Sequence, residues 1–261
     1  MQVMILCGGL GTRLREETEY RPKPMVEIGG RPILWHIMKT YAAHGFRDFV
    51  LCLGYKGAMI KDYFLNYETL NNDFTLTLGS TKKIKFHNAH TEEGWRITFV
   101  ETGPATMTGA RVHRALPYIE SEHFALTYGD GVADIDVKAE RAFHLKHGRQ
   151  ATVAAMRAPS RFGEMVIGEL EQVSDFREKP DTAGSRINGG FFILKRAGLE
   201  KFLQPVNDGL VWERQPLEKL ARQKELKAFQ HDGFWQPMDT YREFELLNKL
   251  WAEGKAPWKN W

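Results

Sequence analysis

The sequence predicts an α/β protein with a Rossmann-like, open, mostly parallel, doubly wound sheet and a smaller mixed or antiparallel subregion. Short apolar runs alternate with amphipathic helical patterns through the first half of the chain, which is typical of strand, helix, strand units. After Ala151 the apolar runs become shorter and no longer alternate with helices. A glycine-rich loop directly follows the first apolar run, at the edge where open α/β sheets bind ligands.

The first half supplies four candidate strands and two clear helices. The strands are expected at residues 3–7, 48–53, 95–100 and 124–128. Between the first two, apolar residues recur with a period near 3.6 over residues 32–44, and Gly45 ends this helix. The segment "ADIDVKAERAFHLKHG" predicts a second helix, because its acidic start suits a helix N-terminus and Gly148 ends it.

The second half predicts short strands followed by helices. The strand-like pieces are "ATVAAM", "EMVIGEL", "QVSDFREK" and "GGFFIL", and the helical pieces are "PLEKLARQ" and "REFELLNKLWAEG". No linker rich in glycine, serine or proline separates the halves. Residues 1–261 are therefore expected to form a single domain whose parts, 1–150 and 151–261, meet over a cleft.

Composition excludes several classes of protein. The net charge of +3, from 36 basic and 33 acidic residues, is too small and too evenly spread for a nucleic-acid surface, so a small anionic substrate fits better. Cys7 and Cys52 lie in apolar runs, which argues against a disulfide and for the reducing cytoplasm. No stretch approaches the roughly 20 apolar residues that span a bilayer, and no export signal is visible. We expect a soluble, cytoplasmic protein without a membrane partner.

The glycine loop "CGGLGTRL" is the first candidate site. A dinucleotide fingerprint would need a further glycine where Leu14 stands and an acidic residue after the second strand, and a P-loop would need Gly-Lys-Ser/Thr. An anion-binding turn remains, in which backbone N–H groups face a phosphate and Arg13 and Lys23 neutralise its oxygens. The glycines alone favour a plain tight turn, but the added "GTRL" and "RPKP" favour the anion site.

The motifs "GGLGTRL", "RPKPMVEIGG" and "PILWHIM", in this order, resemble the sugar-1-phosphate nucleotidyltransferases. Further stretches resemble the cytidylyltransferase group of that family: "CLGYKG", "TGPATMTGAR", "TYGDGVADID", "REKP", "INGGFF", "FWQPMDT" and "LWAEGKAPWKNW". The resemblance covers nearly the whole chain, although residues 68–94 and 196–210 carry little of it. It implies Mg²⁺-assisted transfer of a cytidylyl group from CTP to α-D-glucose 1-phosphate, with release of pyrophosphate. It also implies a hexamer or another symmetric homo-oligomer.

The resemblance assigns the nucleotide to the glycine loop and to residues further along the chain. Arg13 is expected on the departing pyrophosphate and Lys23 at the α-phosphate, and with Asp130 they form the implied catalytic set. The implied nucleotide-binding residues are Leu6, Gly8, Gly9, Gly11, Thr12, Arg13, Lys23, Thr106, Thr108, Arg111 and Asp130. The residues do not by themselves show which base is bound, because pocket shape decides it, so dTTP and UTP remain alternatives to CTP.

Two carboxylates are the implied Mg²⁺ ligands. Asp130 follows a predicted strand in "TYGDG", where a hard oxygen ligand can meet Mg²⁺ on phosphate oxygens, and Asp239 lies in "FWQPMDT". Taken alone, an Asp-Gly turn explains Asp130 and an N-cap near Arg242 explains Asp239, and the resemblance favours metal binding over both. Asp134 and Asp136 superficially resemble an Asp-x-Asp metal motif, but capping of the next helix explains them more simply.

The sugar-phosphate site is implied in residues 151–261, together with the oligomer contacts. Glu178 can accept hydrogen bonds from sugar hydroxyls, Lys179 can pair with the phosphate, and Asn188 with Gly189 can offer an amide and a close backbone approach. Tyr128 is expected in the same pocket. Taken alone, "EKP" predicts an exposed turn.

The tryptophans near the carboxyl end carry a separate prediction. Trp251, Trp258 and Trp261 stand in an otherwise polar segment, which indicates a subunit contact.

Two other functional classes stay open. A glycosyltransferase that uses a nucleotide sugar would bind metal through the Asp134-x-Asp136 pair and would release no pyrophosphate. A catalytically silent sensor would keep the glycine loop and lose part of the charged set. That set, which comprises Arg13, Lys23, Asp130, Lys179 and Asp239, is complete in the sequence, which argues against the sensor.

Overall fold

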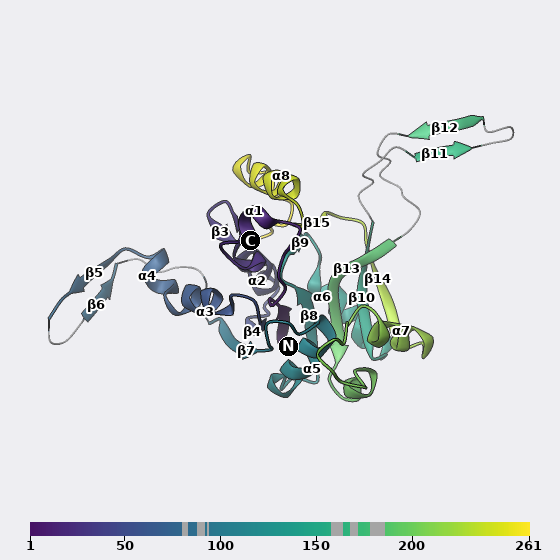
Figure 1. The fold of residues 1–261 in the computed structure, drawn as a ribbon, viewed down its shortest axis with the longest axis horizontal. Coiled ribbons are helices and arrows are strands. Elements are labelled where there is room, and N and C mark those ends of the chain that lie inside the picture. Colours follow the sequence, from purple (N-terminus) through teal and green to yellow (C-terminus); the bar gives the residue numbers. More distant parts are fainter. Residues whose placement is uncertain (80–82, 88–91, 93, 158–163, 168–171, 178–185) are drawn as a thin grey trace.

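The computed structural model describes residues 1–79, 83–87, 92, 94–157, 164–167, 172–177 and 186–261. Within them, seven strands form one sheet in the order β14-β10-β13-β8-β1-β4-β7 (Figure 1). Their bounds are β1 (Val3–Leu6), β4 (Asp48–Leu53), β7 (Arg96–Glu101), β8 (His123–Tyr128), β10 (Ala151–Arg157), β13 (Arg186–Lys195) and β14 (Leu226–His231). The four strands predicted in the first half are confirmed, each within one residue at either end.

The sheet is mostly parallel, as predicted. Strand β1 pairs in parallel with β4 and β8, β4 with β7, and β10 with β14. Strand β13 runs antiparallel to both β8 and β10, so the strands of the second half extend the first sheet. A separate two-stranded ribbon, β11 (Glu164–Ile167) with β12 (Val173–Arg177), lies between β10 and β13 in sequence.

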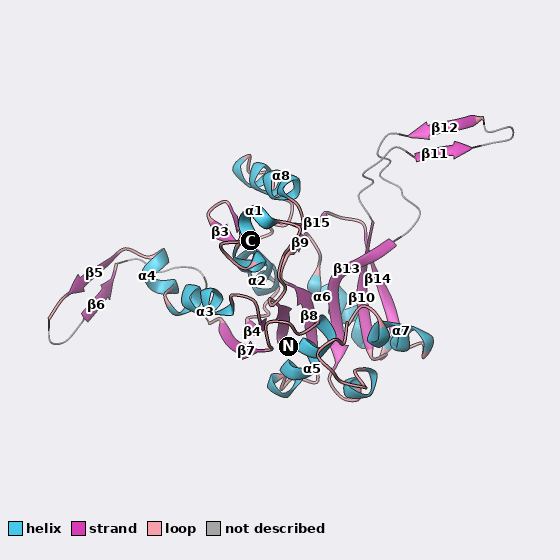
Figure 2. Cartoon of the chain, in the orientation of Figure 1, coloured by secondary structure: helices cyan, strands magenta, loops and turns pink. Residues whose placement is uncertain are grey.

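Helices cover both faces of the sheet (Figure 2). One face carries α2 (Ile33–Ala43), α3 (Gly57–Leu65) and α6 (Val137–His147), and the other carries α5 (Thr108–Ala115) and α7 (Gln215–Arg222). Successive side chains of β1 alternate between the two cores, with Val3 and Ile5 in the first and Met4 and Leu6 in the second. This alternation is what a doubly wound sheet requires, and it confirms the predicted fold class.

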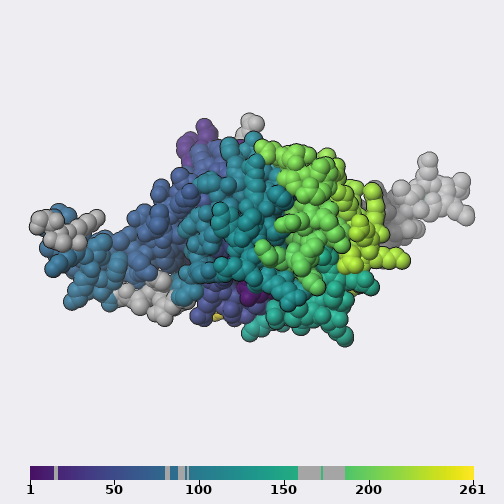
Figure 3. All heavy atoms as spheres, turned by 90° about the horizontal axis from the view of Figure 1, so that it is seen from below, coloured from purple at the N-terminus to yellow at the C-terminus, as the bar shows by residue number. Residues whose placement is uncertain are grey.

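The remaining elements are short, apart from the last helix. They are α1 (Arg15–Thr18), α4 (Tyr67–Asn71), α8 (Tyr241–Ala252), the 3₁₀ helices η1 (Lys23–Met25), η2 (Leu116–Tyr118) and η4 (Leu199–Phe202), and the strands β2 (Glu27–Ile28), β3 (Arg31–Pro32), β5 (Phe74–Thr77), β6 (Lys83–Phe86), β9 (Gly131–Ala133) and β15 (Trp235–Pro237). The hairpin of β5 and β6 stands out from the body at one end of the molecule (Figure 3).

The predicted caps of α6 are right in part. The Asp136 side chain accepts a hydrogen bond from Ala139 N at 2.9 Å, and Gly148 ends the helix with φ +65°. Asp134 does not cap the helix, so the prediction is wrong for this residue. Its Oδ1 lies 2.9 Å from Nε2 of His231, the last residue of β14.

The tryptophans near the carboxyl end pack within the chain. Trp258 is fully buried, and its Nε1 donates to Nδ1 of His36 at 3.3 Å. Trp251 and Trp261 lie with their rings against His36, and Trp261 also meets Trp35 edge-on. The predicted subunit contact is therefore wrong for Trp258, and it stays a prediction for the two partly exposed tryptophans.

Cys7 and Cys52 are both free and buried, as predicted. Among the helices of the described chain, none is long and apolar enough to cross a membrane.

Glu140 on α6 is a buried carboxyl with an unusual titration. It is fully buried, and neither carboxyl oxygen has a hydrogen-bond partner within the described residues. Burial raises the pKa of Glu140 to about 8, from an ordinary value of 4.5. The folded state therefore keeps a proton that the unfolded chain releases above pH 4.5, so this group lowers the free energy of unfolding progressively between pH 4.5 and 8.

Glu140→Gln is expected to become more stable relative to the native chain as the pH rises from 5 to 8, by roughly 3 kcal/mol. The buried amide carries its own cost at both pH values, so only the change with pH is informative. Denaturant unfolding at the two pH values measures it, with the exposed Glu218→Gln as control. A stability difference that is the same at pH 5 and pH 8 would contradict the prediction.

Candidate active site

A cavity of about 600 Å³ opens at the carboxyl ends of β1 and β8. Most of the predicted site residues line it: Leu6, Gly8, Gly9, Gly11, Thr12, Arg13, Lys23, Thr106, Thr108, Arg111, Tyr128, Asp130, Asn188, Gly189 and Asp239. Glu178 and Lys179 lie outside the described residues. The structure thus brings the predicted nucleotide-side residues together with Tyr128, Asn188 and Gly189.

The glycine loop after β1 needs glycine for steric reasons. Gly11 has φ +65°, and a Cβ there would lie 2.7 Å from Cγ2 of Thr18. The Gly11 carbonyl accepts hydrogen bonds from Leu14 N and from Oγ1 of Thr18, both at 3.0 Å. The loop is therefore tied to the turn that follows it, while Gly9 has open space on its Cα side.

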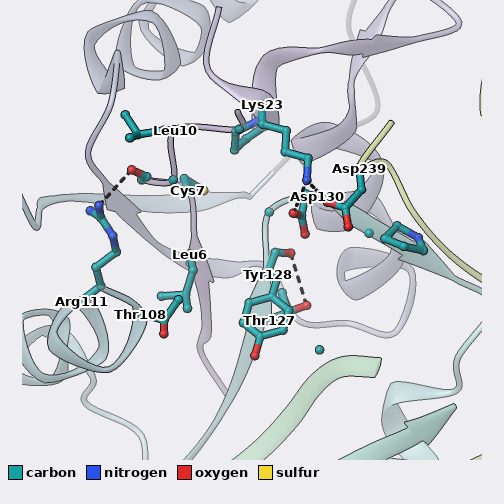
Figure 4. Close-up of a pocket in the computed structure, with 18 of the residues that line it drawn as sticks. Leu6, Cys7, Leu10, Lys23, Thr108, Arg111, Thr127, Tyr128, Asp130 and Asp239 are labelled. Atoms are coloured by element: carbon teal, nitrogen blue, oxygen red, sulfur yellow. Dashed lines mark hydrogen bonds and ion pairs between the residues drawn. The ribbon is translucent and has the colours of Figure 1, made fainter. Parts of the chain in front are cut away.

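Two cations and two carboxylates form a connected cluster beside this loop, and Figure 4 shows three of the four, Lys23, Asp130 and Asp239. Nζ of Lys23 lies 2.7 Å from Oδ2 of Asp130 and also pairs with Oδ1 of Asp239. The second oxygen of Asp239 lies 2.8 Å from Nη1 of Arg13. Lys23 is 8% exposed, whereas the side chain of Arg13 is 73% exposed. Residues more than 200 positions apart therefore share one charged site.

Lys23 stays charged in this buried position. Burial by itself lowers the pKa of Lys23, but the charges and hydrogen bonds of Asp130 and Asp239 outweigh it and raise the pKa above the usual value. The ammonium is therefore a fixed positive charge at neutral pH. The two carboxylates contact this one cation, so both of them can reach a common small cation with hard oxygen ligands.

Strand pairing explains why the two carboxylates meet. Strand β9 pairs antiparallel with β15, with Gly131 opposite Pro237, and Met238 N donates to the Asp130 carbonyl at 2.8 Å. Asp239 does not cap α8, because Thr240 and Glu243 form a capping box there. The carboxylate of Asp239 is therefore left to the charged cluster, and the N-cap alternative for this residue is wrong.

Arg111 lines the cavity but uses its guanidinium largely on the protein itself. Nη2 donates to the Gly8 carbonyl at 2.9 Å, and Nη1 donates to Leu53 O at 3.0 Å, to Oγ1 of Thr102 at 2.7 Å and to Gly103 O at 2.8 Å. Arg111 thereby joins the loops that follow β1 and β7 to the last residue of β4. Burial lowers the pKa of Arg111 somewhat. Its contact with a nucleotide stays a prediction.

The same guanidinium explains two glycines of the sequence motifs. A Cβ on Gly8 would lie 2.1 Å from Nη1 of Arg111, and a Cβ on Gly54 in "CLGYKG" would lie 2.5 Å from the same atom. Gly8 therefore excludes every larger residue unless Arg111 moves, and at Gly54 a Cβ would also lie 2.7 Å from the Gly8 carbonyl oxygen.

Arg111→Lys is expected to lower both the free energy of unfolding, by about 2 to 4 kcal/mol, and kcat/KM. An ammonium has no planar fork, so some of the buried carbonyls lose their donor and the glycine loop loses its anchor. Denaturant unfolding and steady-state kinetics measure the two effects, with the 78% exposed Arg222→Lys as control. Stability equal to that of the control would show that these hydrogen bonds do not hold the loop.

The opposite side of the cavity holds Tyr128, Asn188 and two residues that sequence reasoning missed. Trp235 Nε1 donates to the Gly189 carbonyl at 2.8 Å, and Glu213 accepts a hydrogen bond from the Tyr128 hydroxyl at 2.5 Å. Trp235 stands inside the quoted motif "FWQPMDT", so a signal for it existed. Glu213 stands in no motif that the resemblance uses.

Comparison with known proteins decides the family. The profile described as "Nucleotidyl transferase" matches residues 2–245. The chain belongs to the nucleotidyl transferase family. It is 51% identical to a glucose-1-phosphate cytidylyltransferase of Salmonella typhi and 43% identical to a probable glucose-1-phosphate cytidylyltransferase of Bacillus subtilis strain 168, with all of each chain covered. The names of these two relatives agree with the resemblance of the sequence motifs to the cytidylyltransferase group.

The fold also agrees with that of a solved structure. A putative glucose-1-phosphate thymidylyltransferase from Bacillus anthracis superposes with a TM-score of 0.71 at 16% identity. The match covers 100% of this chain and 97% of that one. At this identity the likeness supports the fold alone.

Proposed function

We propose that this protein transfers a cytidylyl group from CTP to α-D-glucose 1-phosphate and releases pyrophosphate. The observation that carries the proposal is the cluster of Lys23, Asp130 and Asp239 at the glycine loop. It is supported by full-length identity of 51% to a protein named for this activity.

In the proposed reaction an oxygen of the sugar phosphate attacks the α-phosphorus of CTP in line. A P–O bond to the sugar phosphate forms as the P–O bond to pyrophosphate breaks, and pyrophosphate leaves opposite the attacking oxygen. The attacking phosphate is already ionised, so no side chain has to act as nucleophile or base. Catalysis then depends on positioning and on neutralising charge.

The charged residues have separate tasks in this scheme. The glycine loop, from Gly8 to Thr12, directs backbone N–H groups toward the triphosphate. Lys23, held in place by two carboxylates, neutralises charge that develops at the α-phosphate. Arg13 is exposed at the rim, where it can leave Asp239 and pair with the departing pyrophosphate.

Asp130 and Asp239 are the residues that would hold Mg²⁺. They fit this ion because two carboxylates converge on one position, and Mg²⁺ is commonly bound by one or two carboxylates with the remaining ligands from phosphates and water. When bound, the ion would supply charge neutralisation and alignment of the phosphates. Lys23 would then lie beside the ion and turn its ammonium toward phosphate oxygens.

The sugar phosphate is proposed to lie on the side of Tyr128, Asn188 and Gly189, with Glu178 on a sugar hydroxyl and Lys179 on the phosphate. This division gives residues 1–150 mainly the nucleotide and residues 151–261 mainly the sugar phosphate and the oligomer contacts.

A symmetric homo-oligomer in the cytoplasm completes the proposal. The β5–β6 hairpin supports the first part and adds a contact surface outside residues 151–261, because its apolar side chains Phe74, Leu76, Ile84 and Phe86 are 38–43% exposed and pair across the two strands. An isolated two-stranded hairpin with an apolar face is marginally stable in water and is expected to need a covering surface.

Pyrophosphate release tests the reaction class. The purified chain with CTP, glucose 1-phosphate and Mg²⁺ is expected to form pyrophosphate and CDP-glucose in equal amounts. A glycosyltransferase would consume a nucleotide sugar and release no pyrophosphate, so nucleotide-sugar turnover without pyrophosphate would overturn the proposal.

A further inference from the structure

We propose that Glu213 is a positioning residue that fixes the direction of the Tyr128 hydroxyl, so that Tyr128 accepts a hydrogen bond from a hydroxyl of the sugar ligand. The inference rests on the proposed function and deepens it. Glu213 lines the same cavity, although it stands 83 residues from Asp130 in sequence and in no recognised motif.

The carboxylate of Glu213 is held by two hydroxyl groups, one on each oxygen. The Tyr128 hydroxyl donates to Oε1 at 2.5 Å, and Oγ1 of Thr108 donates to Oε2 at 2.6 Å. Tyr128 ends β8, and Thr108 begins α5. Figure 4 shows both hydroxyls on the side of the pocket away from Lys23. Glu213 thus joins a residue expected on the sugar side to one expected on the nucleotide side.

The backbone around Glu213 is fixed by the start of α5. The Leu210 carbonyl accepts from Gly109 N at 2.9 Å and from Ala110 N at 3.1 Å, which satisfies two free N–H groups of that helix. Trp212 is fully buried, and its backbone N–H donates to Oγ1 of Thr108 at 2.9 Å. Glu213 therefore has little freedom to move away from Thr108.

These contacts decide which hydrogen-bonding groups remain for a ligand. A hydroxyl has one hydrogen to donate and two lone pairs. The hydrogen of Tyr128 is committed to Glu213, and one lone pair accepts from Nδ2 of Asn188 at 3.3 Å. The group left for a ligand is a lone pair, so Tyr128 is set to accept a hydrogen bond from a sugar hydroxyl.

Packing fixes the ring of Tyr128 in the same orientation. Gly190 has φ +78°, and a Cβ there would lie 2.4 Å from Cδ2 of the ring. The ring, its hydroxyl and the carboxylate form one rigid unit.

Glu213→Gln tests the inference, because it keeps the shape and changes the hydrogen-bond pattern. Thr108 Oγ1 accepts from Trp212 N and donates to Oε2 of Glu213, and an amide that keeps this second bond places its oxygen on Thr108 and its NH₂ group toward Tyr128. The phenol must then accept from the amide and turn its own hydrogen toward the ligand. Tyr128→Phe removes the hydroxyl, and the exposed Glu218→Gln is the matched control.

Steady-state kinetics give kcat and the KM of each substrate for every variant. The triphosphate used is the one that the native chain turns over. Glu213→Gln is expected to raise KM for glucose 1-phosphate about tenfold, with kcat and the KM of the triphosphate within about threefold of native values. Tyr128→Phe is expected to raise the same KM. The KM of the double variant for glucose 1-phosphate should not exceed that of the single variant with the higher KM. Glu218→Gln should change nothing.

Two results would overturn the inference: an unchanged KM for glucose 1-phosphate in Glu213→Gln, whether or not its melting temperature falls, or effects of the two single variants that multiply. If Glu213→Gln does not fold, Tyr128→Phe decides, because an unchanged KM for glucose 1-phosphate in that variant also overturns it. A native chain that turns over no triphosphate is a different outcome, because it rejects the proposed function itself.

Discussion

Lys23→Ala is expected to lower the turnover of CTP and glucose 1-phosphate by at least about a hundredfold, the scale on which one preorganised charge acts. Lys23 is buried, held by Asp130 and Asp239, and aimed at the cavity beside the glycine loop. Its removal takes away the fixed positive charge that is proposed to lie beside the α-phosphate. It also leaves two carboxylates close together without the cation that joins them.

The measurement is kcat for the variant, with circular dichroism to verify that it is folded. Lys61→Ala is a suitable control, because this lysine pairs with Glu101 on the surface and does not line the cavity. A folded Lys23→Ala variant with near-native turnover would remove Lys23 from the catalytic set.

Asp130→Asn and Asp239→Asn are each expected to lower turnover by about a hundredfold and to raise the Mg²⁺ concentration needed for half-maximal rate. An amide keeps the shape of the carboxylate but loses the charge that attracts a divalent cation. In the native chain a chelator is expected to abolish turnover, and added Mg²⁺ to restore it.

Asp134→Ala is the matched control for these two variants. It replaces a nearby aspartate that pairs with His231 instead of the charged cluster, so it is expected to change stability more than turnover. An unchanged Mg²⁺ dependence in both Asn variants would contradict the assignment of the two carboxylates to the metal.

The fold could be predicted because its signals are local. The apolar run that forms β1, the alternating cores on its two faces and the glycine after α2 all follow from neighbouring residues. The capping box at Thr240 was also legible as a Thr-x-x-Glu pattern, and it would have removed the N-cap alternative for Asp239.

The assembly of the site could be predicted only as a set of residues and not as a geometry. Asp130 meets Asp239 because β9 pairs with β15, and such short strands carry too little pattern to be paired from sequence. Arg111 donates to backbone carbonyls, and these contacts cannot be predicted from the sequence because every residue has a backbone carbonyl. Glu213 acts through hydroxyls far along the chain, in a segment that follows the part with little resemblance.

The most direct test of the central claim is the base that the purified protein uses. Turnover with glucose 1-phosphate and Mg²⁺ is compared for CTP, UTP, dTTP, ATP and GTP, scored by pyrophosphate release at several triphosphate concentrations. We expect kcat/KM for CTP to exceed each of the others by at least about tenfold. A higher kcat/KM for dTTP or UTP would contradict the cytidylyl assignment, and no pyrophosphate with any of the five would contradict the proposed reaction.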